Sequence, residues 1–271
     1  MTTFRENIQT MLLGSLYTVA SVGVFAVANQ LNMVGSMFQS AIATASRPLA
    51  SELYDAGDYE QMGQVYQTTT KWTFTVNLPL FLVMLLFPAT ILSLFGKSFV
   101  AGAVALSLLA SAIMVDISTG MCGIILDMTG HTTLKLINSI VRLVMSLGLS
   151  ILLIPQWGVV GAALATLLVV ATVNVLRLLQ VFVLFRLLPY NLSFFKPITA
   201  GLAAVATVAA CGIMLSGIAT PWREMLQIGM LFGVYVVVLL SLGLSPEDRI
   251  VLARARHRLD PRLSRSALHD H

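Results

Sequence analysis

Two charged residues, Asp116 and Arg142, fall in the middle of long apolar segments. Asp116 lies 12 residues before Met128 and Arg142 lies nine residues after Thr133, so at about 1.5 Å per helical residue both lie roughly 14–18 Å from the same end of two adjacent antiparallel helices. An ionisable side chain costs about 2.5–3.5 kcal/mol inside a membrane unless a partner or water compensates. We therefore predict an ion pair or a shared aqueous cavity, and an ion pair that only fixes the packing of the two helices fits the pattern equally well.

Polar side chains mark one face of each of three apolar segments. Around Arg142 they recur at steps of three and four residues, as on one face of an α-helix. This first stripe contains Lys135, Ser139, Arg142, Ser146 and Ser150, with Asn138 beside them. A second stripe lies in residues 19–46 and ends at Arg47, with Asn29, Asn32, Ser36, Gln39 and Ser40. A third contains Asn174 and Arg177, which are three residues apart.

The three stripes together predict a water-filled, hydrogen-bonding cavity. Its basic side chains favour an anionic ligand, because charged donors make the stronger hydrogen bonds to phosphate and carboxylate oxygens. For Asn174 alone, an interhelical hydrogen bond of about 0.6–2 kcal/mol is the simpler explanation. The predicted cavity residues are Arg142, Asp116, Asn138, Ser139, Ser146, Asn29, Asn32, Gln39, Arg47, Asn174 and Arg177.

The remaining reactive side chains do not form a catalytic or metal-binding pattern. Asp127, His131 and Lys135 are spaced four residues apart, but Gly130 interrupts the helix between them, so we interpret this segment as a hinge and cap. The two cysteines, Cys122 and Cys211, lie within apolar runs and are expected to be buried packing residues. The sequence contains no CxxC, HExxH or phosphate-binding glycine motif. We therefore expect a protein that is not an enzyme and that has no metal and no cofactor.

The composition explains how these side chains are positioned. Hydrophobic residues make up 57% of the chain and charged residues only 10%, and the mean hydropathy is +0.88. A soluble domain has about 25% charged residues, and only helices or closed barrels satisfy the backbone within lipid. The long, uniformly apolar runs predict an all-α, polytopic integral membrane bundle. We expect a stub at 8–17 that is too short to cross, followed by seven spans at 19–46, 72–95, 100–127, 133–154, 157–188, 198–217 and 223–245.

The turns between the spans indicate an orientation. In "LIPQWGVVGAALAT" (153–166), Pro155 ends one helix and Gly158 allows a tight turn. The alternate turns and the C-terminal tail hold eleven Lys and Arg residues, against two in the turns on the other side. Positive charge stays in the cytoplasm, so we predict an inner-membrane protein with a cytoplasmic C-terminus and with no nucleic-acid partner. Residues 55–71 are expected to form a short helix on the inner surface.

Four stretches in order resemble the C-terminal half of polysaccharide flippases, which belong to the superfamily of multidrug, oligosaccharidyl-lipid and polysaccharide (MOP) exporters. They are "RPLASELYDAGDYEQMGQVYQTTTKW" (47–72), "LSLFGKSF" (92–99), "LDMTGHTTLKLINS" (126–139) and "LLIPQWGVVGAALAT" (152–166). The resemblance implies the second of two six-helix lobes, plus two additional helices at the end. On this template residues 1–18 are a truncated first helix, 19–190 the lobe, 191–245 the two additional helices and 246–271 a basic cytoplasmic tail.

The resemblance implies a transporter fragment that translocates lipid-linked oligosaccharide or polysaccharide precursors for exopolysaccharide or O-antigen biosynthesis. The expected partners are the lipid-linked sugar, membrane lipids, and either a missing N-terminal lobe or a polysaccharide polymerase or glycosyltransferase. A truncated gene product, a wrongly assigned start at Met1 and one half of a split transporter each explain the missing lobe.

Two alternative functions remain open at this stage. One is a multidrug or cation extruder of the same superfamily, although Arg142 and Arg177 favour an anionic substrate over a cation. The other is a membrane scaffold that transports nothing and holds polysaccharide assembly enzymes together.

Overall fold

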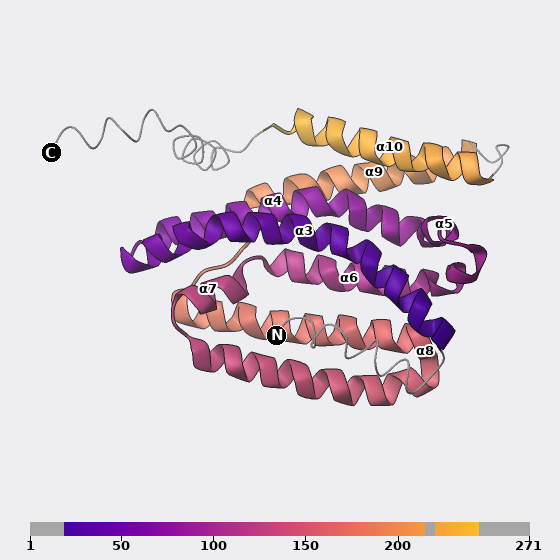
Figure 1. The fold of residues 1–271 in the computed structure, drawn as a ribbon. Coiled ribbons are helices and arrows are strands. Elements are labelled where there is room, and N and C mark those ends of the chain that lie inside the picture. Colours follow the sequence, from indigo (N-terminus) through magenta and orange to yellow (C-terminus); the bar gives the residue numbers. More distant parts are fainter. Residues whose placement is uncertain (1–18, 215–219, 244–271) are drawn as a thin grey trace, which may run out of the picture.

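The computed structural model describes residues 19–214 and 220–243, and every regular element within these ranges is helical (Figure 1). The elements are α3 (Val19–Asp55), α4 (Tyr59–Leu86), α5 (Pro88–Ser93), η1 (Lys97–Gly102), α6 (Ala103–Thr119), α7 (Cys122–Met128), α8 (Thr132–Phe185), η2 (Leu192–Phe194), α9 (Phe195–Met214) and α10 (Thr220–Ser241). Among the described residues, five helical segments are long and apolar enough to cross a membrane, and one of them, α8, corresponds to two of the seven predicted spans. The predicted span at 19–46 is not among the five, and within the described part of α3 the apolar segment is the shorter Val22–Leu31. The chain is therefore a polytopic helical membrane protein, as predicted. The expected stub at 8–17 and the basic tail at 246–271 lie outside the described residues.

The long helices lie side by side in layers (Figure 1). The α9–α10 pair packs on α4, α3 and α4 pack together over α6, and α6 packs on α8. One end of the bundle, which we call the α7 end, contains α7 and the turn between α3 and α4. The opposite end, which we call the α5 end, contains α5, η1 and the bend of α8. Helices α9 and α10 fall within the predicted additional segment 191–245.

Helix α8 is a hairpin of two arms, as the sequence predicts. Its 54 residues bend at Gly158, which has φ 52° and ψ −124°. A side chain would be strained in this conformation, so glycine is the residue that fits. Beyond the bend, a Cβ on Gly161 would lie 2.1 Å from the carbonyl oxygen of Leu153. The small residues after the bend therefore let the two arms approach closely.

Two predicted element boundaries are wrong. The expected surface helix at 55–71 is continuous with the next span, so that α4 runs 28 residues from Tyr59 to Leu86. Packing explains the difference: Met62, Tyr66 and Lys71 are 2%, 1% and 5% exposed, so one face of this segment is buried against the rest of the bundle. The predicted span 100–127 is interrupted at Gly120, which separates α6 from α7.

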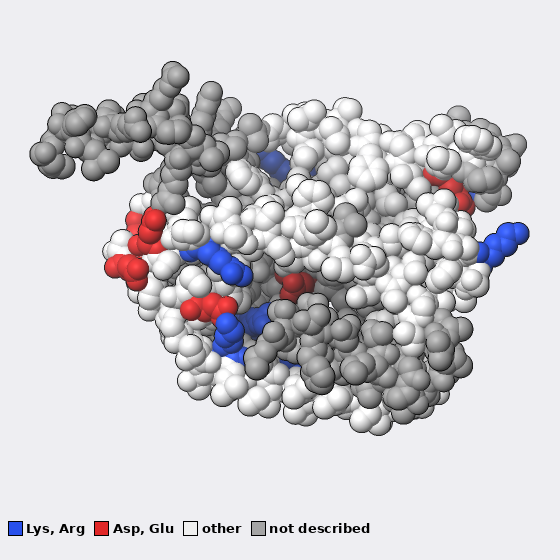
Figure 2. All heavy atoms as spheres, in the orientation of Figure 1, with Lys and Arg blue, Asp and Glu red and all other residues white. Residues whose placement is uncertain are grey.

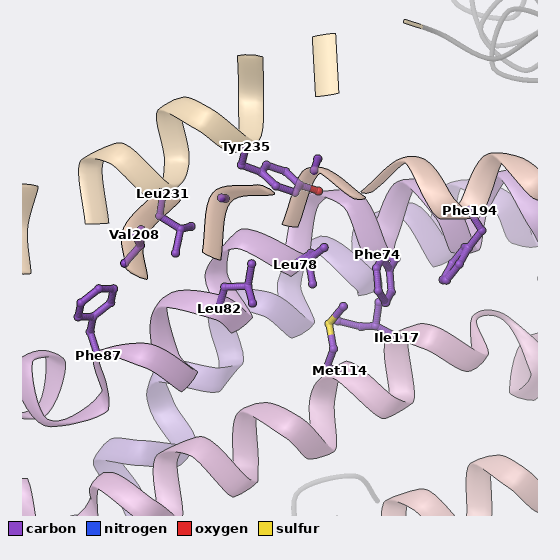
Figure 3. Packing of buried hydrophobic residues seen from close by; sticks show 12 residues of the cluster. Phe74, Leu78, Leu82, Phe87, Met114, Ile117, Phe194, Val208, Leu231 and Tyr235 are labelled. Atoms are coloured by element: carbon purple, nitrogen blue, oxygen red, sulfur yellow. The ribbon is translucent and has the colours of Figure 1, made fainter. Parts of the chain in front are cut away.

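Three apolar clusters hold the bundle together. Figure 3 shows the first, in which Phe74, Leu78 and Leu82 of α4 face side chains of α6, α9 and α10. Tyr235 of α10 also donates a hydrogen bond to the carbonyl oxygen of Thr75, at 2.7 Å, which fastens the α9–α10 pair to α4.

The other two clusters lie toward opposite ends of the bundle. Along α6 and α7, residues 105–109 belong to the cluster at the α5 end and residues 121–126 to the cluster at the α7 end. Asp116 lies on α6 between these two groups of residues. The polar site described next therefore lies between two apolar cores.

Candidate functional site

A cavity of about 290 Å³ opens between α3, α4, α6, α7 and both arms of α8. Its polar lining consists of Gln39, Thr69, Thr70, Thr73, Asp116, Asp127, Lys135, Asn138, Ser139, Asn174 and Arg177. Figure 2 shows one face of the molecule, with charged side chains of both signs toward the α7 end and mostly uncharged side chains over the other described residues. Six of the predicted cavity residues line this one cavity: Gln39, Asp116, Asn138, Ser139, Asn174 and Arg177.

Asp116 joins three helices at the centre of the cavity. Its carboxylate accepts a hydrogen bond from Gln39 Nε2 of α3 at 2.8 Å and another from Asn174 Nδ2 of α8 at 2.8 Å. Two neutral amides thus stabilise the charged carboxylate, which explains how an acid is tolerated inside an apolar bundle.

The hydrogen bonds of Asp116 differ from the ion pair that we predicted with Arg142. Among the described residues, no ion pair joins these two side chains, and Arg142 is absent from the cavity lining. The prediction assumed that Asp116 faces the next helix in sequence, which is the first arm of α8. Instead the second arm, with Asn174, supplies the side chain that reaches Asp116.

Three further predicted residues, Asn29, Arg47 and Ser146, are not part of the described lining of the cavity. Asn29 and Arg47 are exposed on α3, and Ser146 is buried on the first arm of α8. The backbone of Asn32 is part of α3, but its side chain lies outside the described part of the structure. The three stripes therefore lie on helices that contribute to the cavity, but only some members of each stripe line it.

Asn138 has a structural partner as well as a place in the cavity lining. Its Nδ2 donates to Gln180 Oε1 at 2.7 Å, and Gln180 Nε2 donates back to Asn138 Oδ1 at 3.0 Å. This reciprocal pair joins the two arms of α8 and leaves Asn138 only 1% exposed. Its amide therefore fixes the hairpin, and the neighbouring Ser139 is the more accessible polar group.

Arg177 presents an available cation to the cavity. Its guanidinium lies against Gly123 of α7, where a Cβ would be 3.6 Å from Nη1. No hydrogen bond or ion pair joins Arg177 to another of the residues that the structure describes. A guanidinium has five N–H donors in a planar fork that matches carboxylate and phosphate oxygens. The free donors of Arg177 therefore suit an anionic ligand.

Three threonines of α4, Thr69, Thr70 and Thr73, were not predicted to belong to the site. Two of their hydroxyls donate to the carbonyl one turn earlier: Thr70 to Tyr66 at 2.7 Å and Thr73 to Thr69 at 2.8 Å. The hydroxyl of Thr69 lies 3.3 Å from that of Ser46, so each of the three hydroxyls has a partner. The run of three threonines at 68–70 could have indicated a polar face on this helix. It did not lead to a prediction, because we expected residues 55–71 to lie on the membrane surface.

The break between α6 and α7 shapes one wall of the cavity. Gly120 has φ 64° and ψ −137°, and the cavity reaches it and the start of α7. Tyr66 of α4 closes the break, because its hydroxyl donates to the carbonyl oxygen of Thr119 at 2.7 Å and lies 2.8 Å from Cys122 Sγ. Backbone that leaves the helix at membrane depth is tolerated where protein groups pair with it.

An ion pair lies where the cavity meets the α7 end. Lys135 Nζ is 2.9 Å from Asp127 Oδ1, and both side chains line the cavity and remain partly exposed. His131 Nδ1 bonds the Thr129 hydroxyl at 2.8 Å in the same turn. The sequence predicts a hinge and cap here, and the structure adds a direct ionic contact across the turn.

The chain is similar to one protein family and to two curated proteins. Residues 1–153 match the family model MatE. The chain is 22% identical over 252 residues to the probable low-salt glycan biosynthesis flippase Agl15 of Haloferax volcanii, covering 90% of this chain and 51% of that protein. It is 24% identical over 254 residues to the probable flippase AglR of the same organism, covering 90% of this chain and 52% of that protein. The chain thus spans about half the length of the curated relatives that it matches.

Proposed function

Since the chain belongs to the MatE family, we propose that it forms one lobe of a flippase for lipid-linked oligosaccharide or polysaccharide precursors. The two relatives named as flippases and the polar cavity inside a membrane bundle support this assignment. The observation that carries it is Arg177, whose guanidinium lines the cavity with no hydrogen bond or ion pair to another described residue. A phosphate that links a glycan to its lipid carrier supplies the oxygen acceptors that this fork needs.

The cavity lies at the right depth to take a headgroup from one leaflet. Lys135 is in the first turn of α8, and Asn174 lies 11 residues before the end of α8 at Phe185, or roughly 16 Å along the helix. The α7 end carries Lys135, Arg186 and Lys196, whereas the α5 end carries Lys97 and Arg223. We assign the α7 end to the cytoplasm on this bias, so that the cavity accepts the headgroup from the inner leaflet.

The size of the cavity supports a second lobe. About 290 Å³ lies just below the usual 300–1,000 Å³ of small-ligand pockets and suits a phosphate with part of one sugar. A whole oligosaccharide needs more room. We propose that a second lobe, on this or another chain, faces the cavity and completes the path.

The same geometry argues against the extrusion of cations. A cationic drug needs a carboxylate that is available to pair with it, but both oxygens of Asp116 accept amide hydrogen bonds. Asp127 is likewise held by Lys135. The only charged group of the cavity without a bond to another described residue is Arg177, which repels a cation.

The test is ligand binding to the purified chain in micelles. The ligand is a polyprenyl-pyrophosphate-linked disaccharide, and the variant is Arg177→Gln. Hydrogen bonds to charged groups contribute about 1.5–3 kcal/mol, so we expect Kd to rise roughly 10- to 150-fold. Arg186→Gln is the matched control, because Arg186 follows the same helix but lies exposed outside the cavity. Equal affinity in the parent chain and Arg177→Gln would contradict the proposal.

A further inference from the structure

Helix α7 is a seven-residue helix that lies between two glycines with positive φ. Gly120, two residues before it, has φ 64°, and Gly130, two residues after it, has φ 75°. A Cβ on Gly130 would meet no atom within 4 Å, so this glycine has open space around it. Glycines with positive φ change conformation at low cost, which makes them suitable hinge points.

α7 forms part of the cavity wall close to the α7 end of the bundle. Gly123, Ile124 and Asp127 face the cavity, whereas Cys122 and Ile125 are each 1% exposed in the apolar cluster behind them. A movement of α7 about the two glycines would widen the cavity and expose that cluster. The position of α7 therefore sets how open the cavity is at this end.

Two polar contacts hold α7 in the position observed. At its first residue, Cys122 Sγ bonds the Thr119 carbonyl at 2.8 Å and the Tyr66 hydroxyl at 2.8 Å. Near its last residue, Asp127 pairs with Lys135 of α8 across the Gly130 turn at 2.9 Å. The first contact is fully buried, but Asp127 and Lys135 are 32% and 59% exposed and face the cavity. Only the second contact is accessible to a ligand.

We infer that a phosphate-bearing ligand releases α7, by binding Lys135 in place of Asp127. The carboxylate of Asp127 pairs with Lys135 as the anionic group of a ligand would, and both residues line the same cavity as Arg177. A pyrophosphate carries more negative charge than a carboxylate, so it competes effectively for Lys135. Once Asp127 is free, the hinges let α7 leave the wall. This inference rests on the proposed function for the identity of the ligand, and it adds that ligand binding releases α7.

Cys122 provides a direct readout, because its thiol is buried while α7 is in place. The experiment measures the rate of N-ethylmaleimide labelling of Cys122 in the whole chain with Cys211→Ser, with and without inorganic pyrophosphate. Sodium chloride at equal ionic strength controls for screening. We expect pyrophosphate to accelerate labelling about two- to five-fold, the range for releasing one solvent-accessible ion pair.

Variants of the ion pair make the result specific. Asp127→Asn and Lys135→Gln should each label about two- to five-fold faster than the parent and should no longer respond to pyrophosphate. Asp55→Asn is the control, since it removes a carboxylate at the end of α3, outside the cavity lining. It should behave as the parent does. Cys211 is partly exposed, contrary to the prediction that both cysteines are buried, and therefore serves as a reference thiol. Its labelling rate in a Cys122→Ser background should stay constant in every variant that keeps its fold.

The inference is overturned if Asp127→Asn labels at the parental rate or still responds to pyrophosphate. If Asp127→Asn also raises the labelling rate of Cys211, this variant has lost its fold. The same two criteria are then applied to Lys135→Gln. The assay needs no glycan lipid. If the chain responds to pyrophosphate but does not bind the lipid-linked disaccharide, the release of α7 is supported and the proposed function is contradicted. If it binds the disaccharide but does not respond to pyrophosphate, only the release of α7 is contradicted.

Discussion

Replacing Gly120 with alanine tests whether the break between α6 and α7 is fixed by a close contact as well as by backbone conformation. A Cβ at Gly120 would lie 2.0 Å from Thr70 Oγ1, 2.9 Å from its Cβ and 3.0 Å from its Cγ2. Gly130 is the matched control, because its φ is also positive but no atom lies within 4 Å of the new methyl position.

The expected magnitudes follow from these two environments. Alanine in a left-handed conformation costs about 1–2 kcal/mol, which applies to both variants. Forcing a methyl into a packed contact costs about 1–3 kcal/mol more, which applies only to Gly120→Ala. We therefore expect Gly120→Ala to lower the free energy of unfolding by about 2–5 kcal/mol and Gly130→Ala by about 1–2 kcal/mol.

The assay is reversible unfolding of the purified chain in mixed micelles, followed by tryptophan fluorescence. The double variant Gly120→Ala/Thr70→Gly removes all three atoms that meet the methyl, so the two substitutions should show a favourable coupling of about 1–3 kcal/mol. Equal losses for Gly120→Ala and Gly130→Ala, with no coupling to Thr70, would refute the close contact and with it the described shape of this cavity wall.

Three further predictions concern the interior of the bundle. Asp116→Leu should cost about 1–4 kcal/mol of unfolding free energy in the same assay, because it leaves the buried amide of Asn174 and the partly exposed amide of Gln39 without their acceptor. An unchanged stability would contradict the two hydrogen bonds of Asp116. Asn138→Ala and Gln180→Ala should couple by about 0.6–2 kcal/mol in a double-mutant cycle, and additive losses would exclude the reciprocal pair. Gly161→Ala should destabilise by about 1–3 kcal/mol, whereas Gly148→Ala, with open space at its Cβ, should be neutral or stabilising by up to about 1 kcal/mol. Similar shifts in the midpoint of unfolding for these two glycine variants would argue against the close approach of the α8 arms.

The helices and the hairpin could be predicted because their signals are local. Apolar length and Gly158 act on the chain within a few residues, and they predict two arms joined by a tight bend. The prediction that Pro155 ends the first arm is wrong, because the helix continues through Pro155 and bends three residues later, at Gly158. The break at Gly120 could not be predicted in this way, since a single glycine within an apolar run is compatible with a continuous membrane helix. What stabilises the break is Tyr66, which lies 53 residues earlier in the chain and donates to the exposed carbonyl.

The candidate site shows the same division between local and distant information. The periodic stripes identify α3 and both arms of α8 as polar helices, and Gln39, Asn174 and Arg177 do meet in the cavity. The partner of Asp116 depends on which helix packs against α6, and sequence adjacency favoured the wrong arm. Which residues of a polar stripe line the cavity, and which contact another helix, is likewise determined by packing. For this reason Ser146 is buried outside the cavity.

The most direct test of the central claim is to locate a bound lipid-linked glycan on the protein. A polyprenyl-pyrophosphate sugar with a photoreactive group on the first sugar is cross-linked to the chain in membranes, and the labelled peptides are identified by mass spectrometry. The account predicts labels on the cavity walls, within 39–43, 116–127, 135–139 and 174–177, and competition by pyrophosphate but not by a cationic dye. Labels confined to the outer faces of α9 and α10, or competition by the dye alone, would contradict it.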